Sequence, residues 1–120
     1  MRIALAIWEG RISPVFDVSR RMLILDVEEG VIIGKSRETL ANDNPVIKAA
    51  KLAEIGVGTL ICGAISRHVQ EILATYGIRT IPFIAGNIEQ VEAAYLEGNL
   101  TDASFKMPGC TVAKERIDKR

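Results

Sequence analysis

The hydrophobic pattern of this sequence changes its period near residue 44, and that change restricts the folds that the chain can adopt. Before it, three short apolar runs at 2–8, 22–27 and 31–34 predict β-strands. The last two runs are separated only by a Glu-Glu-Gly turn, and so short a connection predicts an antiparallel hairpin. After it, apolar residues recur at helical spacing and alternate with further apolar runs, which is typical of an α/β domain.

Three helices are predicted in this second part, each beginning at a residue that caps helix N-termini. They start at Asn44, Ser66 and Asn87, and a glycine stops each of them. In the first helix, the spacing predicts that Val46 faces the core and that Lys48 lies on another, polar face.

Apolar runs at 57–62 and 78–81 predict two further strands between these helices. Right-handed crossover connections place both strands parallel to strand 2–8 in one sheet. We therefore expect an α/β domain with a five-stranded mixed sheet in the order 3-2-1-4-5 and helices on both faces.

Length and composition indicate a single domain, expected at residues 1–98, with a flexible C-terminal tail at 99–120. A chain of 120 residues is suited to one core, and its apolar periodicity fades from residue 99. Fifteen acidic and fifteen basic residues cancel, which argues against broad nucleic-acid binding. No apolar run could span a bilayer and no export signal is present. We therefore expect a cytoplasmic protein with reduced cysteines and no membrane partner.

A ligand site is expected beyond the carboxyl ends of the parallel strands, where open α/β sheets bind their ligands. The walls of that crevice would be residues 8–16 and the segment from Gly63 to Ser66. The first amides of the helix at Ser66 lack partners within the helix, so they favour an anion, with Arg67 nearby. The alternative is that Ser66 only caps and Gly63 only turns the chain.

Three residues are candidate metal ligands, each with a plainer interpretation. Cys62 ends a strand and is either a thiolate at the crevice or a small core residue. His68 lies in the first turn of the second helix and is either a neutral imidazole ligand or a solvent-facing bystander. Cys110 follows Met107 in the tail and is either a donor that folds over a cluster or an incidental free thiol.

Three segments resemble the dinitrogenase iron–molybdenum cofactor biosynthesis family. They are Arg-Ile-Ala-Leu-Ala at 2–6, Ile-Ser-Pro-Val-Phe-Asp at 12–17 and Leu-Ile-Cys-Gly-Ala-Ile at 60–65, and the likeness covers about residues 1–100. The resemblance implies a ribonuclease H-like fold and a role in binding or carrying iron–sulfur or iron–molybdenum–sulfur clusters or their precursors. This chain departs from many relatives in the first loop, where it has Val15-Phe16-Asp17 in place of His-Phe-Gly.

We therefore expect a non-catalytic cluster carrier whose partner is a protein that donates or accepts the cluster, and which is a monomer or a weak homodimer. The expected cofactor-binding residues are Ser13, Phe16, Gly63, Ala64, Ile65, Ser66 and Arg67, and the expected metal ligands are Cys62, His68 and Cys110.

Two alternative functions remain open on the sequence. A regulatory or scaffold module, which binds a protein partner or an anionic metabolite without metal, would agree with the absent loop histidine. A nuclease of the ribonuclease H-like type needs several carboxylates at strand ends. Strand 2–8 contains no acid, and Glu9 lies only at its end, so we disfavour the nuclease.

Overall fold

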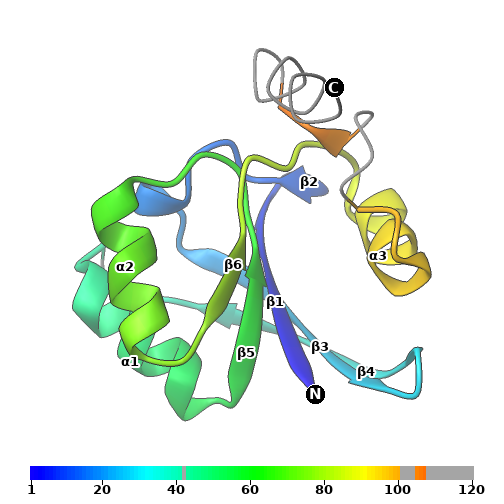
Figure 1. The fold of residues 1–120 in the computed structure, drawn as a ribbon, viewed down its shortest axis with the longest axis horizontal. Helices are drawn as coiled ribbons and strands as arrows, with labels where there is room; N and C mark the ends of the chain where they lie inside the picture. Colours follow the sequence, from blue (N-terminus) through cyan, green and yellow to red (C-terminus); the bar gives the residue numbers. More distant parts are fainter. Residues whose placement is uncertain (42, 101–104, 108–120) are drawn as a thin grey trace, which may run out of the picture.

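The computed structural model describes residues 1–41, 43–100 and 105–107, which form one α/β domain (Figure 1). Its strands are β1 (Arg2–Trp8), β2 (Arg11–Ile12), β3 (Arg21–Glu28), β4 (Val31–Thr39), β5 (Val57–Ile61) and β6 (Arg79–Ile81). Its helices are the short 3₁₀ helix η1 (Phe16–Val18) and the α-helices α1 (Pro45–Glu54), α2 (Arg67–Thr75) and α3 (Ile88–Glu97).

The strands form a mixed sheet in the order β4-β3-β1-β5-β6. Strand β1 lies antiparallel to β3 and parallel to β5, and β5 lies parallel to β6. This order of the five longer strands is the predicted one. It is compatible with a ribonuclease H-like fold, and that finer assignment stays a prediction.

The predicted number of strands was wrong, because the sheet has a sixth strand. Strand β2 pairs antiparallel with the end of β1, with Ile12 opposite Ile7. Glu9 and Gly10 form the two-residue turn between them, both with positive φ, the backbone geometry that two-residue hairpins require. A two-residue strand is too short to show a hydrophobic period, so the sequence pattern did not reveal it.

Helices cover both faces of the sheet, as predicted, and enclose two cores (Figure 1). Helices α1 and α2 pack on one face, where their core contains Ala6, Leu52 and Leu73. Helix α3 packs on the other face, where its core contains Leu5, Ile61 and Val91. Alternate residues of β1 and β5 point to opposite faces, so both strands are mostly apolar.

The predicted helix caps are confirmed. Asn44 accepts hydrogen bonds from the Val46 and Ile47 amides, at 2.9 and 3.2 Å. Asn87 caps α3 in the same way, and Ser66 accepts from the third residue of α2. Within the described part of the chain, no helix has the length and hydrophobicity needed to cross a membrane.

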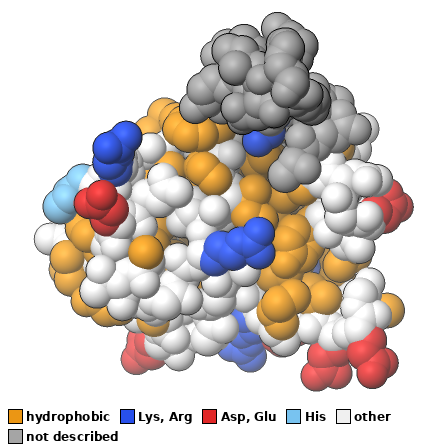
Figure 2. Space-filling model, viewed as in Figure 1, with side chains coloured by type: hydrophobic (Ala, Val, Ile, Leu, Met, Phe, Trp, Pro, Cys, Tyr) orange, Lys and Arg blue, Asp and Glu red, His pale blue; other side chains and the backbone are white. Residues whose placement is uncertain are grey.

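Charged side chains of both signs are scattered over the face shown in Figure 2 and do not gather into one basic surface. Hydrophobic side chains collect in the middle and right of that view, on the side of α3 (Figures 1 and 2). A basic surface is what non-specific nucleic-acid binding depends on, so this face offers no such interface.

Candidate functional site

The loops that follow β1 and β5 lie against each other at the carboxyl end of the sheet. The Phe16 amide donates a hydrogen bond to the Ala64 carbonyl at 2.8 Å, and the Ala64 amide donates to the Pro14 carbonyl at 2.8 Å. The Phe16 side chain is fully buried in the core on the α1–α2 side. The two predicted walls of the crevice are therefore in direct contact.

Gly63 makes this close approach possible. A Cβ atom at position 63 would lie 2.5 Å from the carbonyl oxygens of both Ser13 and Pro14, far inside contact distance. Glycine thus permits the backbone at position 63 to approach a neighbour closely, and that neighbour is the loop at Ser13 and Pro14. No ligand fits between Gly63 and these two carbonyls.

The carboxylate of Asp17 lies at the N-terminus of α2. The Ser66 amide donates to Oδ1 of Asp17 at 3.2 Å, so a carboxylate from η1 lies at the positive end of the helix. The Ser66 hydroxyl accepts from the Val69 amide at 3.3 Å. Arg67 and His68 are exposed on the first turn, and their predicted roles in ligand binding stay predictions.

Lys48 holds the same loop from the side of α1. Its Nζ donates to the Phe16 carbonyl at 2.7 Å and lies 4.1 Å from the centroid of the Phe16 ring. The side chain is only 1% exposed, and burial lowers the pKa of its ammonium group.

The predicted faces of α1 were therefore wrong at Val46 and Lys48. Lys48 is buried with Ala49 and Leu52, while Val46 is 47% exposed. A lysine is usually solvated, so its type alone gave no sign of burial. The one available signal was its spacing, because Lys48 and Leu52 lie four residues apart on one helix face.

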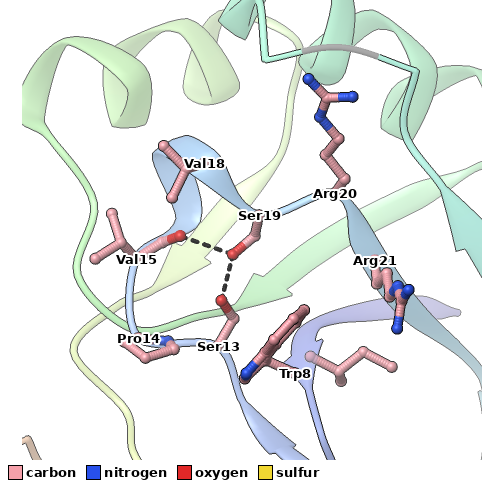
Figure 3. Close-up of a pocket in the computed structure, with 9 residues that line it drawn as sticks. Trp8, Ser13, Pro14, Val15, Val18, Ser19, Arg20 and Arg21 are labelled. Carbon is pink, nitrogen blue, oxygen red and sulfur yellow. Dashed lines mark hydrogen bonds between the residues drawn. The ribbon is translucent and has the colours of Figure 1, made fainter.

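A pocket of about 500 Å³ lies beside Trp8 and is lined mainly by the chain that connects β1 to β3 (Figure 3). That volume is in the range of small-molecule sites. Trp8, Val15 and Val18 offer apolar surface to it, and each is exposed. The residues that line the pocket are Ile7, Trp8, Ser13, Pro14, Val15, Val18, Ser19, Arg20 and Arg21.

Two serine hydroxyl groups of this pocket are hydrogen-bonded within the protein (Figure 3). Ser19 donates to the Val15 carbonyl at 2.7 Å, so its oxygen accepts the proton of Ser13 across 2.5 Å. Both serines are buried. This chain of hydrogen bonds fixes the curve of the loop that carries Val15 and Val18, and the pocket wall is therefore preformed.

Arg21 supplies the available positive charge. Its guanidinium lies 5.8 Å from the centroid of the Trp8 ring, within the range of a cation–π contact. Among the ion pairs of the described residues, Arg21 takes part in none, whereas Arg20 pairs with Asp43. The pocket can thus offer one cationic donor group beside an aromatic face, a combination that suits an anion with apolar or polarisable surface.

The structure places Cys62 inside the core. Its side chain is fully buried, and burial raises the pKa of the thiol to about 12. In this conformation the group is a neutral thiol, and its role as a thiolate ligand stays a prediction.

Of the other predicted metal ligands, His68 is exposed on α2, and Cys110 lies outside the described residues. Residues 105–107 pair with the loop after β6, where the Met107 amide donates to the Phe83 carbonyl at 2.9 Å. No group of three or more His, Cys, Asp or Glu side chains in the described ranges could hold a metal ion. Of the predicted cofactor-binding residues, Ser13 lines the pocket beside Trp8, together with Trp8, Pro14 and Val15 from the predicted wall.

The chain thus has an α/β fold with a pocket lined by Trp8 and Arg21. The chain belongs to the dinitrogenase iron–molybdenum cofactor family, whose sequence model matches residues 1–98, and the resemblance noted above is confirmed. No curated protein matches the chain.

Solved structures share this fold. PH0822 is 22% identical, and the match covers 84% of this chain and 95% of that one with a TM-score of 0.78. The apo form of the orange protein from Desulfovibrio gigas is 20% identical, with 88% and 94% covered and a TM-score of 0.69. A Methanocaldococcus jannaschii protein provisionally described as a dinitrogenase is 17% identical, with 88% and 96% covered and a TM-score of 0.68. At these identities the likeness shows the fold alone.

Proposed function

We propose that this chain is a non-catalytic carrier that binds an anionic metal–sulfur species, an iron–sulfur or iron–molybdenum–sulfur cluster or its precursor, in the pocket beside Trp8. The observation that carries the proposal is the Arg21 guanidinium, which lies near the Trp8 ring and forms no ion pair with a described residue, at a pocket of about 500 Å³ in a member of this family. The cluster is the cargo, and the partner is a protein that donates or accepts it.

The chemistry of the cargo fits the lining of the pocket. Sulfide-rich anions are large, soft and polarisable, so the indole of Trp8 and the side chains of Val15 and Val18 suit their surface. Arg21 supplies a charge-assisted hydrogen bond to the anion. No thiolate bond to a described residue is required, which keeps the binding reversible, as a carrier needs.

A second function is favoured by a different observation. The Ser66 amide already donates a hydrogen bond to Asp17. Cys62 is buried and protonated, so it offers no thiolate to a metal. These features agree with a regulatory module that binds an anionic metabolite or a protein partner without metal.

Anaerobic loading separates the two functions. Incubation with iron and sulfide, or with tetrathiomolybdate, followed by desalting, is expected to leave visible absorption and roughly one equivalent of anion or cluster on the protein. Molybdate, which has the same charge as tetrathiomolybdate but oxygen in place of sulfur, is the matched control and is expected to be lost. Equal retention of molybdate supports the metal-free module, and retention of neither contradicts the carrier.

A further inference from the structure

Arg20 is a second guanidinium at the pocket, but the structure shows it engaged elsewhere. Its Nε lies 3.1 Å from Oδ1 of Asp43, and its Nη2 lies 3.4 Å from Oδ2. Its Nη1 donates to the Ala41 carbonyl at 3.4 Å. All three nitrogen atoms of the guanidinium are therefore directed at the segment before α1.

The two neighbouring arginines thus differ in direction, although both line the pocket. In Figure 3, Arg20 extends away from Trp8, while Arg21 lies on the Trp8 side of the strand. The carboxylate of Asp43 also offsets the charge of Arg20, so the pocket at rest presents the positive charge of Arg21 alone.

The hold of Asp43 on Arg20 is weak enough to be released. The side chains of Arg20 and Asp43 are 51% and 44% exposed, and one of the two hydrogen bonds between them is 3.4 Å long. An ion pair in such an exposed position changes an equilibrium by at most about fivefold. An anion with two negative charges in the pocket can compete with a single carboxylate for this guanidinium.

We infer that Asp43 competes with the bound anion for Arg20 and thereby limits the affinity of the pocket for the anion. Asp43 is then a positioning residue, because it acts on the ligand through Arg20. Binding then transfers Arg20 from Asp43 to the anion and adds a second guanidinium to that of Arg21. The inference rests on the proposed function, because it concerns the same pocket.

The test is equilibrium dialysis of the full chain against tetrathiomolybdate under anaerobic conditions, with bound molybdenum measured. Asp43→Asn is expected to raise the affinity three- to fivefold, because Arg20 is freed from the carboxylate. The matched control is Asp26→Asn, since Asp26 pairs with Arg2 at 3.0 Å with similar exposure but at the opposite end of β1 from Trp8. The control removes the same charge and is expected to leave the affinity unchanged.

A double-mutant cycle shows whether Asp43 acts through Arg20. In the Arg20→Gln variant, adding Asp43→Asn is expected to have no further effect on affinity. The inference is overturned if Asp43→Asn does not raise the affinity for tetrathiomolybdate, or if Asp26→Asn raises it as much. It is also overturned if Asp43→Asn raises the affinity equally with and without Arg20. In each of these cases the proposed function stands. If neither wild type nor Asp43→Asn binds the anion, the inference and the proposed site both fail.

Discussion

Replacing Gly63 with alanine is expected to lower the free energy of unfolding by about 3 kcal/mol and the thermal midpoint by about 10 °C. The added methyl group would lie 2.5 Å from the carbonyl oxygens of Ser13 and Pro14. Both are backbone atoms, and their loop is held by hydrogen bonds to Ala64, so neither can move without breaking contacts. The two loops must then separate, and the pocket wall that Ser13 helps to form is lost with them.

Gly58→Ala is the matched control for this substitution. Gly58 lies in the same strand–loop unit, and a Cβ there would meet nothing within 4 Å. Alanine at that position is expected to be neutral or slightly stabilising, because it restricts the unfolded chain. Thermal unfolding followed by circular dichroism compares the two variants. Equal midpoints for Gly63→Ala and Gly58→Ala would show that the loops are not locked together as the structure indicates.

The Cys62 thiol is expected to react about 1,000-fold more slowly with iodoacetamide at pH 8 than an ordinary cysteine. Burial raises its pKa from 9.0 to about 12, which lowers the thiolate fraction by that factor before any restriction of access. The unfolded chain would release this proton near pH 9, whereas the folded chain holds it. The thiol's contribution to stability is therefore present below pH 9 and falls as the pH rises towards 12.

The measurement uses the Cys110→Ser variant, in which Cys62 is the one remaining thiol of the chain's two. Mass spectrometry gives the rate of alkylation in native buffer and in denaturant, and the Cys62→Ser variant gives the rate of the other thiol. Similar rates for Cys62 in the two solvents would mean that the thiol is accessible and ionised in the folded protein. Its predicted role as a metal ligand would then gain support.

The sequence predicted the five longer strands and the starts of the three helices, because both depend on local patterns. The order of those strands then followed from the short hairpin and the right-handed crossovers. Strand β5 is mostly apolar, and the capping residues Asn44, Ser66 and Asn87 each satisfy amides of their own helix. These signals are contained within a few residues, so no knowledge of the tertiary structure is needed.

The site was harder to predict, because its geometry depends on contacts between distant segments. The buried ammonium of Lys48 is satisfied by carbonyls 31 and 32 residues away, and Asp17 reaches an amide 49 residues away. Those contacts close the crevice expected between Phe16 and Gly63. The pocket beside Trp8 is lined on one side by residues of the predicted wall 8–16, and on the other by Val18, Ser19, Arg20 and Arg21, which that prediction did not include.

Binding of tetrathiomolybdate to Arg21→Gln and Arg67→Gln variants tests most directly where the anion binds. Each substitution removes one exposed guanidinium, one beside Trp8 and the other at the start of α2. In anaerobic equilibrium dialysis, Arg21→Gln is expected to lower the affinity at least tenfold, as the loss of a charged hydrogen bond does. Arg67→Gln is expected to bind like wild type. A loss of binding in Arg67→Gln with none in Arg21→Gln would place the anion at α2 and contradict the pocket proposed here.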